Sequence, residues 1–411
     1  MTKWKAHYGS DGYEVADSEA ARHGRSVMEQ KIALMRPTGL ALMRRVHEDM
    51  PADRVAYGSR LAFVFDDELD VEPSALVQSM AEEHGAATRE EDKIPTLLVQ
   101  IADQTSAIHD NALRQMAQRA RVPMDYLGRL LKSEHAPMRD LARQMLNRHY
   151  SAQPDNANAR YLVRSVRGTV RGFLSDKYRR LNSAQLLDAF AGACSIVGAV
   201  PGAGTYTDTR IEMTAYLPRV FEPVPNEVMM VGLSWKNSDY GHGKHALALT
   251  ILRVVCTNKA TMEDVLGQVH IGGRLTDDIE FSERTYRLDT ETTCSALRDL
   301  VTQYLGADKV NNLMETIRNA HEKGMEWKNV RTALERVLLK NEAAAVRAAF
   351  ESDDVINLPP GNTAWRMSNA VSWFAHNVED QGRQMELAAI AGAIAGGKSV
   401  ASVLASLEAA E

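Results

Sequence analysis

The stretch "RYLVRSVRGTVRGFLSDKYRR" (160–180) decides the fold prediction. Two runs with strand character, 159–166 and 169–175, lie on either side of the dipeptide Arg167-Gly168. Glycine readily takes the positive φ angle that a tight hairpin turn requires. The stretch is therefore predicted to be a β-hairpin. It is unusual in carrying seven Arg or Lys residues against a single acid, Asp176.

A helix and three strands are predicted after the hairpin. The helix covers 182–198, and either Asn182 or Ser183 can cap its start. The three strands are 205–221, 227–238 and 241–258. The order hairpin, helix, strands predicts an α+β core, residues 151–288, in which a curved antiparallel sheet carries at least one helix.

Helical regions are predicted on both sides of this core. Residues 1–150 form a mostly helical N-terminal region in this prediction, with helical periodicity from 95 to 150 and a short strand at 61–65. Residues 289–411 are rich in good helix formers and predict a helical C-terminal region, interrupted at "NLPPGNT" (357–363).

The composition is that of a globular protein without a membrane segment. Of the 411 residues, 45% are hydrophobic and 25% are charged, and such a length predicts two or three lobes. The longest uncharged run, 189–200, is shorter than the roughly 20 apolar residues that span a bilayer. The amino terminus lacks the apolar core of a signal peptide, and the three cysteines form no CxxC pair. We therefore predict a cytoplasmic protein.

The formal net charge of −6 conceals a strong asymmetry. Residues 66–93 hold ten acids against two basic residues, whereas residues 114–180 hold fifteen Arg or Lys against five acids. A local positive field of that size favours a polyanionic partner even in an acidic chain. Internal pairing of the two segments is the alternative interpretation.

The basic hairpin predicts a surface that grips nucleic-acid phosphates. Guanidinium groups bind phosphate oxygens through paired hydrogen bonds, and Phe173 and Tyr178 could stack on bases. The predicted contacts from the first hairpin are Arg164, Arg167, Arg171, Lys177, Tyr178, Arg179 and Arg180. The predicted contacts from the second hairpin are Lys236, Lys244, Arg253 and Lys259.

Residues 112–132 have the spacing of a helix-turn-helix. Ala117 is small where the two helices would cross, and Val122 is the apolar residue after the turn. Arg121 occupies the turn position at which glycine is common, so the left-handed conformation there carries a steric cost. The second helix would be anchored by Leu127 and Leu130 and would present Asp125, Tyr126, Arg129 and Lys132 to duplex DNA. An ordinary helical hairpin in a core is the more frequent origin of this pattern.

No catalytic motif is recognisable in the sequence. The chain has no GxSxG, HExxH or Walker sequence, and no GxGxxG after a strand. The run "GHGKH" (241–245) does not match a phosphate loop, and His242 and His245 lack a third ligand at suitable spacing. The acidic run "DDELD" (66–70) is explained by an acidic turn. We predict no enzyme, no cofactor and no metal.

Three blocks of the chain resemble the phage/plasmid-like protein family that carries an uncharacterised domain. They are "YLVRSVRGTVRGFLSDKYRRLNSAQLLDAF" (161–190), "GLSWKNSDYGHGKHALALTILRVVCTNKATM" (232–262) and "TAWRMSNAVSWFAHNVEDQGRQMELAAIAG" (363–392). Lys259 departs from the family, which often has glycine there. The resemblance implies a phage or plasmid origin and no assigned activity. The order of elements also resembles single-strand annealing recombination proteins, at the level of the fold alone.

The charge pattern and these likenesses together predict a single-stranded DNA-binding and annealing protein of a phage or plasmid. It would act in DNA recombination without ATP, as a homo-oligomeric ring or filament. One alternative is a non-enzymatic structural or protein-interaction component whose arginines pair with a partner's acids. Another is a double-strand DNA-binding regulator that acts through residues 112–132. The oligomer number, the choice between DNA and RNA, and the partner proteins are left open.

Overall fold

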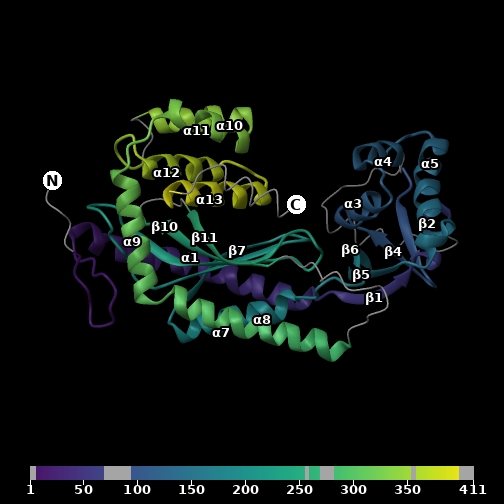
Figure 1. Cartoon of the computed structure of the whole chain (residues 1–411), viewed down its shortest axis with the longest axis horizontal. Coiled ribbons are helices and arrows are strands. Elements are labelled where there is room, and N and C mark those ends of the chain that lie inside the picture. The colour runs from purple at the N-terminus through teal and green to yellow at the C-terminus, as the bar shows by residue number, and fades with distance from the viewer. Residues whose placement is uncertain (1–5, 69–93, 255–258, 269–281, 353–357, 398–411) are drawn as a thin grey trace.

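The computed structural model describes residues 6–68, 94–254, 259–268, 282–352 and 358–397 and has an α+β fold (Figure 1). The predicted α+β class is confirmed, with a helix near the N-terminus and a helical C-terminal region. The terminal helices are α1 (Glu19–Glu48), α8 (Glu283–Tyr304), α9 (Ala307–Glu322), α10 (Trp327–Val337), α11 (Lys340–Glu351), α12 (Ala364–Ala375) and α13 (Gln381–Ala395). None of the helices in the described ranges is both long and apolar enough to cross a membrane.

The first lobe is built on a mixed sheet in the strand order β1-β5-β6-β4-β3-β2. Its strands are β1 (Ala52–Tyr57), β2 (Leu61–Phe65), β3 (Leu97–Ile101), β4 (Gln104–Ile108), β5 (Arg160–Val166) and β6 (Thr169–Ser175). Its helical segments are α3 (Asp110–Arg119), α4 (Met124–Leu131), α5 (Ala136–Asn147), η3 (Arg148–Ala152) and α6 (Pro154–Ala157), with short turns η1 (Gly58–Arg60) and η2 (Asp66–Glu68). Helices α3, α4 and α5 share one apolar core with the sheet.

The predicted hairpin is present, but it belongs to the first lobe. Strands β5 and β6 pair across a turn in which Arg167 and Gly168 have φ angles of 48° and 82°. Strand β5 also pairs with β1, and β6 pairs with β4 in parallel. The prediction that the hairpin and the later strands form one sheet is therefore wrong, because strands from the N-terminal region flank the hairpin on both sides.

Strands β1, β3 and β4 lie in the region predicted to be mostly helical, whereas β2 has the predicted bounds. The reason for the error between 97 and 108 is the turn that joins β3 to β4. Ala102 has a φ angle of 53° there, a conformation that alanine rarely adopts. Because no glycine marks this turn in the sequence, residues 97–108 were predicted to continue as one helix.

The second lobe is built on an antiparallel sheet in the strand order β11-β10-β9-β8-β7. Its strands are β7 (Val200–Tyr206), β8 (Ile211–Tyr216), β9 (Met229–Asn237), β10 (His245–Arg253) and β11 (Lys259–Gln268). Helices α7 (Ser183–Ile196) and α8 lie on one side of this sheet, and α12 and α13 lie on the other (Figure 1). Helix α1 packs along β7.

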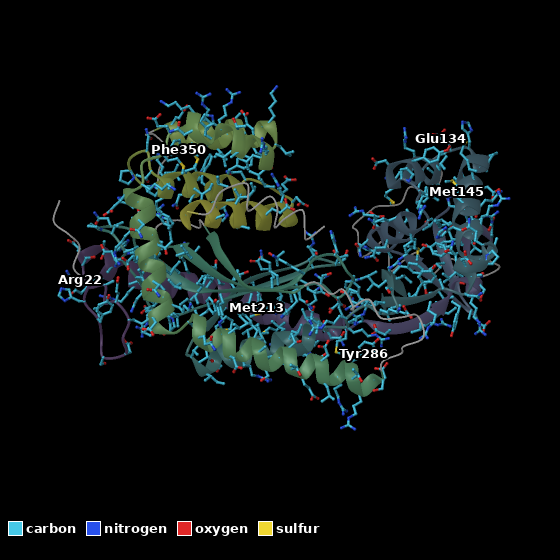
Figure 2. All side chains as sticks on the ribbon, in the orientation of Figure 1. Arg22, Glu134, Met145, Met213, Tyr286 and Phe350 are labelled. Atoms are coloured by element: carbon cyan, nitrogen blue, oxygen red, sulfur yellow. The ribbon has the colours of Figure 1, made fainter. Side chains whose placement is uncertain are left out.

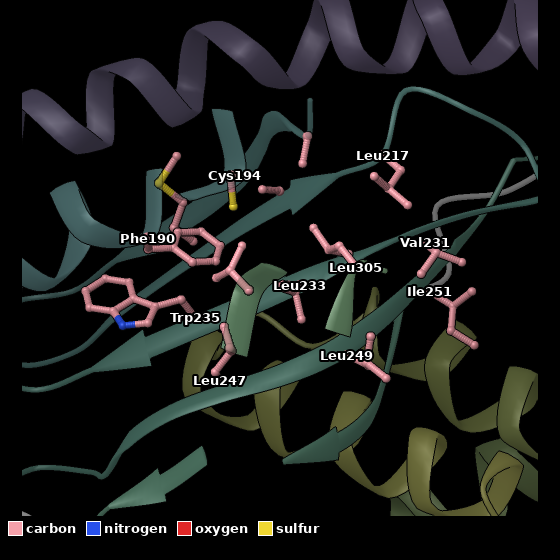
Figure 3. Close-up of a cluster of buried hydrophobic side chains, with 14 of the residues drawn as sticks. Phe190, Cys194, Leu217, Val231, Leu233, Trp235, Leu247, Leu249, Ile251 and Leu305 are labelled. Atoms are coloured by element: carbon pink, nitrogen blue, oxygen red, sulfur yellow. The ribbon is translucent and has the colours of Figure 1, made fainter. Parts of the chain in front are cut away.

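The main core lies between this sheet and α7. Leu233, Trp235, Leu247 and Leu249 point from β9 and β10 toward Phe190 (Figure 3). Alternate residues of a strand face the same side, so this spacing places all four strand residues on one face of the sheet. Full burial of each such side chain stabilises the fold by roughly 1.5–3 kcal/mol.

Candidate nucleic-acid interface

Arg164 of the hairpin lies inside the protein. Its Nε donates to Asp53 Oδ1 at 2.7 Å, its Nη1 donates to the backbone oxygen of Asp239 at 2.8 Å, and its Nη2 donates to Asn182 Oδ1. The side chain is 0% exposed. Burial acts to lower the pKa of Arg164, but the negative charges of Asp239 and Asp53 raise it above its usual value. Arg164 is thus a charged internal group that joins the two lobes.

Arg171, on the second strand of the hairpin, is also buried. Its Nη1 donates to the backbone oxygen of Asp208 at 3.4 Å and lies 3.7 Å from the carboxylate of the same residue. The side chain of Arg171 is 1% exposed. Asp208 lies in the connection between β7 and β8, so this contact also links the first lobe to the second.

Carboxylates distant in sequence pair with the basic residues that follow the hairpin. Arg179 binds Asp289 through two hydrogen bonds of 2.6 Å each. Arg180 lies 3.8 Å from Asp53 and 3.2 Å from Glu283. These two positive charges are neutralised within the chain.

Arg253 and Arg167 are paired in the same way. Arg253 binds Glu227 through hydrogen bonds of 2.8 and 2.7 Å, and both side chains are buried. Arg167, at the hairpin turn, is 63% exposed and lies 2.8 Å from Asp49. Of these arginines, only Arg167 is mainly exposed to solvent.

The remaining predicted contacts offer little open surface. Tyr178 and Phe173, the predicted stacking residues, are buried at 7% and 0% exposure. Lys177, Lys236 and Lys244 are half-buried and have partners of their own. Lys259 lies in β11, and its side chain is outside the described part of the structure.

The predicted open row of arginines on the hairpin is therefore wrong. Arg164, Arg171 and Arg253 are buried against carboxylates, and Arg179 and Arg180 are paired. The error has a physical cause, because the prediction counted acids near each arginine in sequence. The acids that neutralise the hairpin come from elsewhere in the chain, namely Asp49, Asp53, Asp208 and Asp239.

The helix pair α3–α4 has the predicted packing. Ala117, Val122, Leu127 and Leu130 are buried at 0%, 9%, 0% and 2% exposure. The second helix presents the four predicted residues, Asp125, Tyr126, Arg129 and Lys132, to solvent. Arg121 adopts the left-handed conformation in the turn, with a φ angle of 57°. The helix-turn-helix spacing thus corresponds to a pair of packed helices, and the outer face of the second helix is exposed to solvent.

Five exposed basic residues surround this helix pair. They are Arg114, Arg119, Arg121, Arg129 and Lys132. Within the described ranges, no carboxylate lies within ion-pair distance of any of them. Asp125 is the one acid of residues 114–132. Arg114, Arg119 and Arg121 were missed as site residues, although they lie in the basic segment that the charge count identified.

Helix α3 is held rigidly against both lobes. Asn111 donates to the backbone oxygens of Arg171 and Tyr240 at 2.9 and 3.1 Å. Gln115 donates to Tyr240 at 2.7 Å and accepts from the backbone N–H of Phe173, also at 2.7 Å. A surface on such an anchored helix is presented in one orientation. Glu134, between α4 and α5, lies at the outer end of the first lobe (Figure 2).

The histidines near the second hairpin do not add to this surface. Burial, together with the positive charges of Arg210 and Arg114, lowers the pKa of His242 to about 4, so its ring is neutral at pH 7. His245 is buried. Within the described ranges, no three His, Cys, Asp or Glu side chains are grouped as metal ligands.

We expect the Arg121→Gly variant to raise the free energy of unfolding by about 0.5–1 kcal/mol, because glycine takes a positive φ angle without the steric cost that arginine bears. Urea denaturation measures this change. The control is Arg114→Gly, which replaces an exposed arginine within the regular helix α3 and should lose about 1 kcal/mol instead. A loss of stability in Arg121→Gly would contradict the assigned turn.

Comparison with known proteins gives no match: no family model, no curated protein and no solved structure matches the chain. The resemblance to the phage/plasmid-like family stays a prediction.

Proposed function

We propose that this chain is a non-enzymatic, cytoplasmic DNA-binding protein that places α4 in the major groove of duplex DNA. The observation that carries the proposal is the exposed positive charge of the helix pair, which no carboxylate in the described part of the chain pairs with. Arg129 and Lys132 would reach base edges or phosphates from α4, and Arg121 would grip a phosphate at the turn. Arg114 and Arg119 would contact the flanking backbone from α3.

This proposal differs from single-strand annealing, which is the second candidate. Annealing requires one strand's backbone to lie along an extended positive groove with its bases open. The arginines predicted to form that groove are paired internally, and the predicted stacking residues are buried. The helix pair instead offers exposed basic side chains on and beside one short helix, which suits a groove of duplex DNA.

Gel-shift titration with a labelled duplex and its separate strands tests the proposal. We expect the duplex to bind more tightly than either strand. Between 50 and 200 mM salt, duplex affinity should fall roughly 50- to 500-fold, as three to five phosphate contacts require. Tighter binding to the single strand would favour annealing. Binding to neither would favour a protein-interaction component, and either result would refute the duplex proposal.

A further inference from the structure

Gly128 lies in the middle of α4, where the described part of the structure gives it no packing role. Its backbone is helical, and an added Cβ atom would lie more than 4 Å from every described heavy atom beyond its own stretch of helix. Glycine inside a helix is less favourable than alanine, because it loses more backbone freedom on folding. The close approach of a molecule from outside the chain explains a glycine at this position.

The side chains around Gly128 belong to the exposed face of α4. Residues three and four positions apart are neighbours on a helix surface, so Asp125 and Lys132 lie on either side of Gly128. Arg129 follows it directly, and all three side chains are exposed. The glycine therefore leaves a gap in the side-chain cover of this face, between one acid and two basic residues.

Asp125 has the wrong charge for a surface that binds phosphates. No Lys or Arg of the described residues lies within ion-pair distance of it, although Arg129 is only one turn away. A carboxylate at this position stabilises the helix through the macrodipole, but it repels phosphates and so lowers the affinity for DNA of any sequence. It accepts hydrogen bonds and donates none, so it requires a donor on the DNA.

The position of Asp125 on α4 indicates which donor it meets. The second helix of a helix-turn-helix places its N-terminal residues at base edges in the major groove. Asp125 is the second residue of α4, whereas Arg129 and Lys132 lie toward its other end. Cytosine presents a donor there, its N4 amino group, whereas guanine presents two acceptors. Adenine presents a donor beside an acceptor, which suits an amide side chain better than a carboxylate.

We propose that Asp125 makes the duplex site selective for cytosine by accepting a hydrogen bond from the N4 amino group, and that Gly128 lets α4 come close enough for this contact. Arg129 and Lys132 grip the phosphate backbone beyond it. The inference rests on the duplex binding proposed above, and it adds the base that is read and the residue that reads it.

Selection of bound sequences from a randomised duplex library tests the role of Asp125. We expect the wild type to enrich a C·G pair about tenfold at one position, and Asp125→Asn to prefer an A·T pair there, because asparagine pairs with adenine. The control Lys132→Ala should bind all sequences more weakly and keep the preference. If the wild type binds no duplex, the proposed function and this inference both fail. If it binds duplex but Asp125→Asn keeps the wild-type preference, only this inference is overturned.

Gly128→Ala and Gly192→Ala are a matched pair that tests the close approach. Gly192 is exposed on α7, and an added Cβ atom there also has no described heavy atom within 4 Å beyond its own stretch of helix. Alanine is the better helix former, so both variants should raise the urea midpoint of unfolding. Gly128→Ala should nevertheless bind the selected duplex about tenfold more weakly, as expected for a lost base contact, whereas Gly192→Ala should bind as the wild type does. Equal binding by the two variants would refute the close approach of α4.

Discussion

We expect the Arg164→Met variant to lose about 3–5 kcal/mol of unfolding free energy, since it removes one partner of a buried ion pair. Methionine fills part of the space but donates no hydrogen bond. Asp53 Oδ1, the backbone oxygen of Asp239 and Asn182 Oδ1 would each lose a donor. Burial raises the pKa of Asp239, and the charge of Arg164 opposes that effect. The loss would therefore leave a poorly compensated buried carboxylate.

Urea denaturation of Arg164→Met and Arg167→Met measures this effect. Arg167 lies at the turn of the same hairpin but is 63% exposed. Its replacement should cost about 1 kcal/mol, clearly less than that of Arg164, because the buried carboxylate of Asp49 keeps Arg45 at 3.5 Å. If Arg164→Met is as stable as the wild type but loses DNA binding, Arg164 is a ligand contact and the internal role is wrong.

The second large effect concerns the helix pair. We expect the triple variant Arg121→Ala, Arg129→Ala, Lys132→Ala to bind duplex DNA about 100-fold more weakly near physiological salt, because each lost phosphate contact removes about one released counterion. Stability should change little, since all three side chains are exposed and none pairs with a described carboxylate. Fluorescence anisotropy with a labelled duplex measures the affinity.

The control for this variant removes the same charge elsewhere. Arg22, Arg36 and Arg44 are exposed on α1, which packs along β7 of the second lobe and is not part of the helix pair. The triple variant Arg22→Ala, Arg36→Ala, Arg44→Ala lowers the net charge equally and should bind duplex DNA as the wild type does. An equal loss in both triple variants would mean that total charge alone governs binding.

Local patterns were enough to predict several elements of this fold. The Arg167-Gly168 turn predicted the hairpin, and the short apolar run Leu61–Phe65 predicted β2 with the observed bounds. The small residue Ala117 and the apolar residues Val122 and Leu127 predicted the helix pair. Each of these signals lies within a few residues of the structure that it specifies.

Pairings between distant segments could not be predicted in this way. Strand β1 lies beside β5 although more than a hundred residues separate Asp53 from Arg164. Nothing near Arg164 in the sequence shows that Asp53 and Asp239 will approach it. Whether an arginine is a surface charge or an internal link depends on such contacts, so the hairpin's charge was visible in the sequence but its burial was not.

The salt dependence of duplex binding tests the central claim most directly, namely that the helix pair α3–α4 carries the DNA contacts. The slope of log affinity against log salt is measured for the wild type, the helix-pair triple variant and the α1 triple variant. The account predicts that the helix-pair variant has a slope shallower by about 2.7, three contacts at about 0.9 each, and that the α1 variant matches the wild type. Equal slopes for the wild type and the helix-pair variant would contradict it.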